Sequence, residues 1–570
     1  MLIRTTYCYK SATSRWRPLV LHPLAFILSL FVLLGCGSRI DSPEAAEAAI
    51  AETVKKSVQP SYRENQARAN IRLTKTNLSS LLPDLRDYPI RTGQRDSRSV
   101  ESVEIFTSSE KAGTGRDGFY IELAEAFNRE RVQLSNGKTA VISIRKIASG
   151  LGAQFMLAGQ YVPDAFSPSN FLWGEMLNAD GVKMDLIAEK TAPNTAGIIV
   201  KKSKADMITT NGALDIPKLL NNVSNGSFSM GYTNPYQSST GLNFLLTVLN
   251  AFAEGDESQM LSPDVASAFE AFQTGVPFVA QTTLQMRDAA QGSGVLDALV
   301  MEHQSWVNVT GMKDYQFVPF GVRHDSPLYA SPEADASERE ALELFARFIE
   351  SQQPVVTRFG FGKNATYDSA YAIKDSSLIA QAQGIWKEKK SGGRPIAAVF
   401  VADVSGSMDG TRLKNLKKAL IESSDLISAN NAIGLVTFNE RVNVDLYVRN
   451  FDVQQKSLFI GAVERLVASG RTATNDGVLV AANLLIEFKQ QNPDHKQIIF
   501  VLSDGERNRG HSLEDVTTML EWSGIPVHTI AYELSSDELK ELAGLAEGAY
   551  VESNVESASY RIGNLLNSEM

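Results

Sequence analysis

The sequence predicts an α/β protein in which a two-lobed domain precedes a doubly wound domain. From Ser99 to about Gln383, short apolar strand patterns alternate with amphipathic helix patterns, which is typical of a largely parallel sheet. These 285 residues are enough for two lobes. From Ile396 to the end the alternation continues with strands that are apolar throughout, as expected for a sheet covered on both faces.

Within the first domain, each expected element follows from its local pattern of apolar residues. The expected strands are Val103–Phe106, Ala140–Ile144, Gln154–Ala158, Gly197–Val200 and Phe228–Tyr232, and the expected helices include Phe119–Arg129, Leu242–Ala253 and Glu338–Ser351. A charged, glycine-containing stretch over residues 384–395 predicts a linker. The boundaries are therefore 99–383 for the two-lobed domain and 396–570 for the second domain.

Composition excludes several classes of protein. Of the 570 residues, 43% are apolar and 21% are charged, which is ordinary globular composition. The formal net charge of −10, from 55 basic and 65 acidic residues, gives no bulk positive field, so nucleic acid is not expected as a partner. The two cysteines, Cys8 and Cys36, cannot build a disulfide framework.

The N-terminus predicts export from the cytoplasm. Residues 1–23 are basic and lack acids, and the apolar run Leu24–Leu34 follows. This is the pattern of a secretory signal over residues 1–35, and a run of 11 residues is short for a membrane span. An uncleaved anchor reaching back to Pro18 is the alternative, although the prolines there make a poor helix.

Leu33-Leu34-Gly35-Cys36 resembles the lipobox of bacterial lipoproteins. In that family the cysteine is lipidated and becomes the mature N-terminus. The resemblance implies that Cys36 is a lipid anchor holding the protein to the outside of a bacterial membrane. Gly37, in place of an acid after the cysteine, implies the outer membrane if the cell is Gram-negative.

Residues 36–98 are interpreted as a lipid-anchored tether. The stretch Pro43–Lys56 favours one helix, with proline at its start and lysines at its end. The remainder has little to bury. A spacer that holds the next domain away from the membrane is the expected role, and a helix docked on that next domain is the alternative.

The second domain carries the strongest motif. The apolar strand Ile396–Ala402 leads into Asp403-Val-Ser405-Gly-Ser407, and in an extended loop residues i, i+2 and i+4 point the same way. The apolar strand Ile498–Leu502 leads into Asp504 after one serine. Ligands collect at the carboxyl ends of parallel strands, so we expect these oxygens to converge.

A third loop, Ser469–Gly477, supplies further hydroxyls, with Thr472 preferred over Thr474 as the ligand. Two carboxylates and three neutral oxygens suit a hard cation, and Mg²⁺ fits best, with Mn²⁺ or Ca²⁺ as alternatives. Zn²⁺ would require nitrogen or sulfur ligands. The set leaves room for a carboxylate from another molecule, which favours a binding site over a hydrolytic one.

These residues resemble the metal-ion-dependent adhesion site of von Willebrand factor type A domains. The D-x-S-x-S motif matches at Asp403, Ser405 and Ser407, the loop threonine at Thr472 and the last aspartate at Asp504. The resemblance implies a domain that docks an acidic residue of a partner protein and is not an enzyme.

The first domain offers weaker signals. Gly113-Thr-Gly115-Arg-Asp-Gly118 has the spacing of a dinucleotide loop, but the next strand ends in Arg145-Lys146 without the expected acid. The segment Tyr232–Leu242 takes a strand through a hydroxyl-rich turn into a helix, whose free N–H groups favour an anion or polar ligand. Simple N-capping by these hydroxyls is the alternative.

Residues 154–176 and 228–246 resemble the bacterial type 2 extracellular solute-binding fold, and in particular lipoproteins that join it to a von Willebrand factor type A domain. In that fold two lobes close over a small solute. The resemblance implies that an anionic or polar solute is held by Ser108, Ser109, Asn234, Ser238, Ser239, Thr240 and Gly241.

Two functions follow as hypotheses. The first is a lipid-anchored, extracytoplasmic binding protein whose Mg²⁺ site docks an acidic residue of a partner. The second is a receptor for transport or sensing of a small anionic or polar solute. An envelope hydrolase is a third, but none of the nucleophile or metalloprotease motifs is present.

Overall fold

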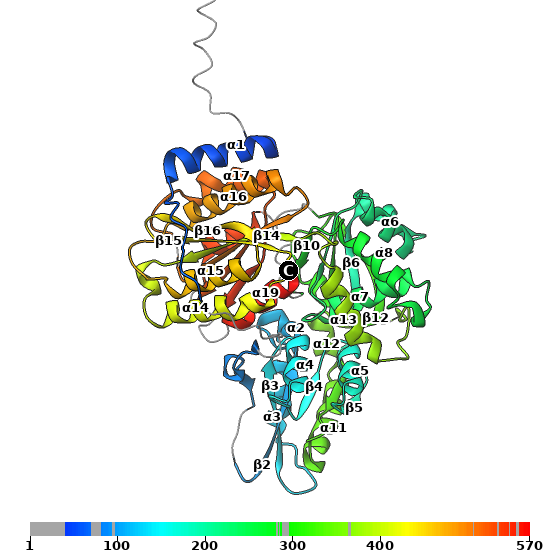
Figure 1. Cartoon of the computed structure of the whole chain (residues 1–570). Coiled ribbons are helices and arrows are strands. Elements are labelled where there is room, and N and C mark those ends of the chain that lie inside the picture. The colour runs from blue at the N-terminus through cyan, green and yellow to red at the C-terminus, as the bar shows by residue number, and fades with distance from the viewer. Residues whose placement is uncertain are drawn as a thin grey trace, which may run out of the picture.

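The computed structural model places two α/β parts side by side (Figure 1). It describes residues 40–69, 81–93, 97–280, 283, 286–287, 296–362, 366–505, 507–532, 535–545, 548–553 and 558–569. Cys36 and the expected signal over residues 1–35 lie outside these described residues. Of the helices in the described ranges, none combines the length and the apolar character that crossing a membrane requires.

The first lobe is built on a six-stranded mixed sheet in the order β1-β3-β2-β4-β13-β5. β2 pairs in parallel with β3 and β4, and the outer strands pair antiparallel. The strands are β1 (Ile90–Thr92), β2 (Val100–Thr107), β3 (Thr139–Lys146), β4 (Ala165–Ser167), β5 (Asp185–Ala188) and β13 (Leu328–Ala330). The helices are α2 (Ser109–Ala112), α3 (Phe119–Glu130), α4 (Ser149–Leu157), α5 (Leu172–Ala179), α11 (Ala336–Ser351) and α12 (Gln353–Arg358).

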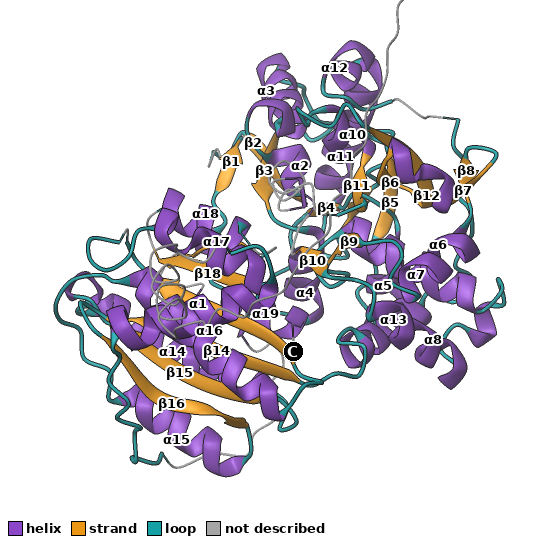
Figure 2. Cartoon of the chain, turned by 90° about the horizontal axis from the view of Figure 1, so that it is seen from above, coloured by secondary structure: helices purple, strands orange, loops and turns teal. Residues whose placement is uncertain are grey.

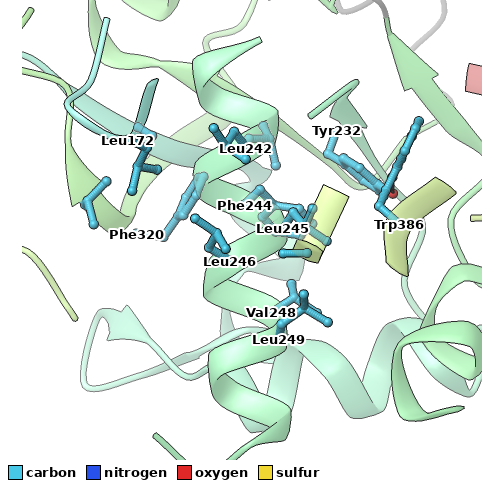
Figure 3. Packing of buried hydrophobic residues seen from close by; sticks show 14 of the residues in the cluster. Leu172, Tyr232, Leu242, Phe244, Leu245, Leu246, Val248, Leu249, Phe320 and Trp386 are labelled. Atoms are coloured by element: carbon cyan, nitrogen blue, oxygen red, sulfur yellow. Dashed lines mark hydrogen bonds between the residues drawn. The ribbon is translucent and has the colours of Figure 1, made fainter. Parts of the chain in front are cut away.

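The second lobe has a five-stranded sheet in the order β10-β9-β11-β6-β12. Its strands are β6 (Thr195–Lys201), β9 (Met230–Thr233), β10 (Phe278–Ala280), β11 (Ala298–Glu302) and β12 (Tyr315–Arg323), with a small pair β7 (Thr209–Thr210) and β8 (Ala213–Leu214) beside it. Its helices include α6 (Ile216–Ser224), α7 (Ser239–Phe252), α8 (Pro263–Gln273), α10 (His303–Val307) and α13 (Ser377–Lys389). The core surrounds α7, where Phe244 packs edge-on against Phe320 with ring centroids 5.6 Å apart (Figure 3).

The chain crosses between the lobes three times, after β5, after β12 and between α12 and α13. A buried polar network lies at the second crossing. His324 is fully buried, with Nδ1 2.8 Å from Glu302 Oε1 and Nε2 3.1 Å from the side-chain amides of Asn170 and Asn243. Because amide nitrogens only donate, His324 Nε2 accepts and Nδ1 carries the proton toward Glu302. The network joins residues of both lobes.

The C-terminal domain is a six-stranded sheet in the order β16-β15-β14-β17-β18-β19. All neighbours are parallel except β16, which pairs antiparallel with β15. The strands are β14 (Ile396–Asp403), β15 (Ala432–Phe438), β16 (Val442–Asn450), β17 (Lys496–Ser503), β18 (Val527–Tyr532) and β19 (Tyr550–Ser553). This doubly wound arrangement confirms the predicted α/β class.

Helices cover both faces of that sheet (Figure 2). Ala398 and Phe400 of β14 face a core formed with α14 (Thr411–Ser423), α15 (Val453–Glu464) and α19 (Ala558–Glu569). Ala397 and Val399 face the opposite core, formed with α16 (Thr474–Gln491), α17 (Leu513–Ser523) and α18 (Asp537–Gly544). Burial on both faces explains why β14 is apolar throughout.

The three predicted helices of the first domain form as α3, α7 and α11, but one predicted strand is wrong. Residues 154–158 belong to helix α4 and the turn after it. A short apolar run fits either a buried strand or a buried helix. Gly150 lets the start of α4 pack directly on the second lobe, because a Cβ there would lie 1.9 Å from Tyr236 O.

The described part of the expected tether packs on the C-terminal domain. Helix α1 (Pro43–Thr53) lies over α16 and α17, and Ile50 is fully buried there (Figure 1). Further along, Ser61 exchanges backbone hydrogen bonds with Val442 and Val444 at 2.9 and 2.8 Å. Residues 40–69 therefore pack on the C-terminal domain and are not a spacer; the docked-helix alternative named the next domain along the chain, whereas α1 lies on the last one.

The predicted linker at 384–395 is also largely structured. Its first half is the end of α13, which packs on α7 and α8. Trp386 is fully buried and donates its indole N–H to the Tyr232 hydroxyl at 2.6 Å. Of the charged residues that suggested a linker, Lys387 and Glu388 are exposed on this helix, whereas Lys389 is half-buried and pairs with Glu270 at 3.2 Å. Residues 390–395 alone connect α13 with β14.

Candidate functional site

The D-x-S-x-S loop begins at the carboxyl end of β14, in the middle of the sheet. Asp403 is fully buried, and its Oδ1 accepts a hydrogen bond from the Ser405 backbone N–H at 2.7 Å. Its Oδ2 accepts one from Ser503 Oγ at 2.5 Å. The hydroxyls of Ser405 and Ser407 lie 3.0 Å apart, so the motif turns both serines to one point.

Asp504 follows β17, the neighbour of β14, and reaches the same point. Ser407 Oγ donates to Asp504 Oδ1 at 2.7 Å, which brings the two carboxylate-bearing loops together. Arg412, in the first turn of α14, pairs with Asp504 Oδ2 at 2.8 Å and also donates to the Ser407 carbonyl at 3.1 Å. The sequence did not predict this arginine, because nothing in the motif shows that α14 folds back over it.

The third loop is tied to the first by its backbone. Gly406 N–H donates to Gly470 O at 3.0 Å, and the N–H of the buried Thr472 donates to Asn508 Oδ1 at 2.9 Å. Two residues further on, the hydroxyl of Thr474 is buried and has no hydrogen-bond partner among the described residues. Gly470 therefore holds the third loop beside the first, and Thr472 as a ligand stays a prediction.

The electrostatics of the cluster fit a bound cation. Burial raises the pKa of Asp403 to about 6, despite the hydrogen bonds from Ser503 and Ser405 that lower it. Two acids and three hydroxyls offer oxygen ligands only, the set that Mg²⁺ prefers. Among the described residues, no group of three or more His, Cys, Asp and Glu forms, so metal clusters of that kind are not found there.

The candidate solute residues divide into two sets. Ser108, Ser109, Ser238 and Ser239 line a small cavity between the lobes, with a volume of about 20 Å³. A water molecule needs roughly 10–15 Å³, so the cavity admits little more than one. The sequence missed Glu110, Ser149, Gln237 and Thr283, which complete its lining.

The other three candidates, Asn234, Thr240 and Gly241, make contacts that stabilise the local fold. Asn234 is buried and its Oδ1 accepts the Tyr236 N–H at 2.8 Å within a turn. The Thr240 hydroxyl lies 3.3 Å from that of Thr283. At Gly241 a Cβ would lie 1.9 Å from Thr233 O, so this glycine permits close packing of α7 on β9. They do not line the cavity, and Ser238 caps α7 as the N-cap alternative proposed.

One carboxyl group faces the cavity. Burial raises the pKa of Glu110, and Glu302 raises it further. The ammonium of its neighbour Lys111 is turned to the backbone oxygens of Ser167 and Pro168 at 2.8 and 3.0 Å, and burial lowers its pKa to about 8. The polar side chains of the cavity are therefore hydroxyls, the Gln237 amide and one carboxyl.

Several contacts hold the lobes closed. Asn170 donates to Ser239 O at 3.0 Å, and Trp173 donates to Ser239 Oγ at 2.9 Å. Asp117, in the glycine-rich loop considered for a dinucleotide, forms an ion pair with Arg287 at 3.2 Å. That loop thus contributes to lobe closure. The next strand lacks the acid that would bind the ribose of a dinucleotide, which agrees with this role.

The C-terminal sheet is a doubly wound α/β domain with its acidic and hydroxyl loops at one edge, and a two-lobed α/β domain precedes it. Residues 398–566 match the family model described as von Willebrand factor type A domain. Over 170 residues the chain is 28% identical to the protein sll0103 of Synechocystis, covering 29% of this chain and 39% of that protein. Over 143 residues it is 27% identical to the human voltage-dependent calcium channel subunit alpha-2/delta-2, and the match covers 25% of this chain and 12% of that protein. The chain thus spans less than half of either relative.

Among solved structures, the chain is similar to a periplasmic thiamin binding protein, with a TM-score of 0.37, 12% identity and coverage of 52% of this chain and 99% of that one. It is also similar to iron-bound HitA from Pseudomonas aeruginosa, with a TM-score of 0.34, 16% identity and coverage of 51% and 99%. A third similar structure is a von Willebrand factor type A protein from Catenulispora acidiphila. Its TM-score is 0.28 at 20% identity, and the match covers 31% of this chain and 43% of that one. Likeness at this level concerns the fold alone.

Proposed function

We propose that this protein is a binding protein of the bacterial cell envelope whose C-terminal domain docks an acidic residue of a partner protein through a divalent cation. The observation that carries this proposal is the contact of Ser407 with both Ser405 and Asp504, beside the buried Asp403. Oxygen donors from separate loops converge there at the carboxyl edge of the sheet.

The residues have distinct parts in this proposal. Asp403 and Asp504 supply the two carboxylates, and Ser405, Ser407 and Thr472 supply neutral oxygens. Mg²⁺, with Mn²⁺ or Ca²⁺ as alternatives, would provide a Lewis-acidic centre that attracts a carboxylate. Because Ser407 is exposed whereas Asp403 is buried, a visiting acid would approach from the side of Ser407. Nothing in this arrangement requires catalysis.

Asp403→Ala tests the metal site. We expect Mg²⁺ binding, measured by calorimetry on the mature chain, to be lost, because a buried carboxylate is removed. Asp409→Ala is the matched control, since Asp409 is exposed in the same loop and its carboxylate accepts the N–H of its own neighbour Gly410. A partner should be retained from membranes with Mg²⁺ and released by a chelator. Equal Mg²⁺ binding by wild type and Asp403→Ala would disprove the proposal.

The proposed location follows from Cys36. A lipid on Cys36 would lie four positions before Ile40, which packs against the C-terminal domain. Four residues span at most about 14 Å. The face that carries α1 would then rest close to the membrane, without the long spacer expected from the sequence. This arrangement does not depend on which membrane the anchor enters.

Cys36→Ser tests the anchor. We expect the variant to leave the membrane fraction and to lose the mass of the acyl chains, whereas Cys8→Ser, within the expected signal, should have no effect. Membrane association and an intact mass that are the same in Cys36→Ser would contradict lipidation. The Mg²⁺ measurement on purified protein is independent of this result.

A second candidate function is capture of a small anionic or polar solute between the lobes. The serine-lined cavity favours it, but a volume of about 20 Å³ means that the lobes must part to admit a solute. A ligand at 100 times its Kd stabilises a protein by about 2.7 kcal/mol. Thermal unfolding of the full chain with solute panels should therefore show a clear shift in Tm, and the absence of any shift would count against it.

A further inference from the structure

A second, larger hollow lies where the second lobe, the connection to β14 and the C-terminal domain meet. Its volume is about 300 Å³, the lower end of the range for small-molecule sites. It is lined by Ser229 and Gln273 of the second lobe, by Lys390 and Arg394 of the connection, and by Lys496 at the start of β17. It is separate from the serine-lined cavity and lies at the opposite end of β17 from Asp504.

The charged groups of this hollow are mostly cationic. Lys390, Arg394 and Lys496 are the basic residues of this lining, in a chain whose formal net charge is −10. Glu569 of α19 pairs with Lys496 at 3.3 Å, and Glu270 of α8, beside Gly393 of the connection, pairs with Lys389 at 3.2 Å. The charged residues that line the hollow itself are all basic.

A buried donor also faces this hollow. Trp386 donates to the Tyr232 hydroxyl at 2.6 Å, and that hydroxyl donates to Gln273 Oε1 at 2.9 Å. Because the tyrosine fixes Oε1 as the acceptor, the other end of the Gln273 amide is the donor Nε2. Gln273 is 3% exposed, and its Nε2 has no hydrogen-bond partner among the described residues. A buried donor without a partner is costly, so a ligand that accepts hydrogen bonds would remove this cost.

We propose that this hollow binds a small molecule through a phosphate or similar oxyanion group, held by Arg394, Lys496, Lys390 and the Gln273 amide. The ammonium and guanidinium groups and the amide Nε2 of this set are hydrogen-bond donors and cannot accept, which selects an anion over a cation or an apolar ligand. Burial lowers the pKa of Lys390 well below its usual range, against the opposing effect of Glu569, and a bound anion would favour its charged form.

Stabilisation of helix ends does not by itself explain why these three basic residues lie together. Lys390 follows the last turn of α13, where a cation interacts favourably with the helix dipole. Arg394 lies beyond that helix and Lys496 begins a strand, so neither stabilises a helix end there. Their gathering with Gln273, from three separate parts of the chain, is what an anion site requires.

Arg394→Glu tests the proposal, because Arg394 is exposed and its reversal leaves the core intact. Inorganic phosphate is titrated into the full mature chain by calorimetry in buffer free of divalent cations. We expect wild type to bind phosphate and Arg394→Glu to bind it about tenfold more weakly or worse, as loss of a charged hydrogen bond predicts. Arg465→Glu, an exposed arginine on the far side of the C-terminal domain, is the matched control and should bind as wild type does.

Further variants make each outcome decisive. Ser391→Glu places a negative charge in the hollow and keeps all four proposed donors. If Arg394→Glu fails to fold, weaker phosphate binding by Ser391→Glu tests the proposal instead. Asp403→Ala should still bind phosphate, so this result is independent of the metal site. Absence of phosphate binding by wild type, equal binding by Arg394→Glu, or equal weakening by Arg465→Glu would overturn the proposal. Weakening by Ser109→Ala alone would place the anion between the lobes and would also overturn it.

Discussion

The hydroxyl of Tyr560, on the last helix of the von Willebrand factor type A domain, lies 2.9 Å from Gln237 Nε2 in the second lobe. The same hydroxyl lies 3.2 Å from Gln154 Oε1 in the first lobe. It therefore accepts from one lobe and donates to the other, beside the serine-lined cavity that Gln237 helps to form. One residue of the C-terminal domain thus bridges both lobes of the first domain.

Tyr560→Phe removes this bridge without changing the ring. Tyr560 is buried, so Gln154 and Gln237 would lose a partner inside the interface. We expect stability to fall by about 1–2 kcal/mol and hydrogen exchange to rise in α4 and in the turn before α7. Tyr62→Phe, at a side chain that is 50% exposed, is the control and should change neither quantity. Unchanged exchange in both lobes would show that the bridge does not hold them together.

Arg412→Ala should strengthen Mg²⁺ binding. Arg412 pairs with Asp504 and places a positive charge beside the proposed metal site, so its removal frees a ligand and removes a repulsion. We expect a gain of about fivefold in affinity, close to 1 kcal/mol, as is typical of a partly exposed charge pair. Titration calorimetry measures it, with Arg441→Ala as the control on the nearby β15–β16 turn. Weaker Mg²⁺ binding by Arg412→Ala would mean that this arginine helps to build the site.

Asp164→Asn should stabilise the protein at neutral pH. Burial raises the pKa of Asp164 to about 6, and the carboxylates of Glu338 and Glu104 raise it further, whereas the hydrogen bond from the Glu104 backbone N–H lowers it. With a native pKa above the unfolded one, the ionised acid costs stability above pH 6, and the cost disappears as pH falls below about 4. Because the group is partly exposed, we expect a gain of about 1–2 kcal/mol.

Denaturant unfolding of wild type and Asp164→Asn at pH 7.5 and at pH 4 measures this effect. The difference between the two proteins should be largest at pH 7.5 and should shrink toward zero at pH 4, since both side chains are then neutral. A difference that grows as the pH falls would have the wrong sign and would exclude a raised pKa. The comparison between the proteins cancels the titration of other groups.

The sequence predicted that the D-x-S-x-S loop and Asp504 would meet, because both follow strands that are buried on both faces. An apolar run such as Ile396–Ala402 is expected to form a central strand of a parallel sheet. Asp403 then lies at the carboxyl end of that strand, where ligands bind in such sheets. The same logic fails for Gln154–Ala158, whose apolar run fits a buried helix equally well. Close packing at Gly150 decides that case, and it depends on Tyr236, more than 80 residues away.

The contacts between domains were beyond the sequence for a related reason. Residues such as Gln154, Gln237 and Tyr560 are far apart in the chain, and none belongs to a local motif. The same holds for Lys390 and Lys496, which look like ordinary surface lysines until the fold brings them to one hollow. The local sequence pattern determines a helix or strand, whereas contacts between distant residues depend on how whole helices and strands pack together.

Ile50→Ala tests whether the segment before the first lobe belongs to the C-terminal domain. Ile50 is fully buried among residues of that domain, and loss of a buried isoleucine typically costs about 2–5 kcal/mol. We expect unfolding of the C-terminal domain to shift to lower denaturant by a corresponding amount. Glu44→Ala, on the exposed side of α1, should have little effect. If α1 were a free spacer, both variants would unfold as wild type does, because no apolar contact would be lost.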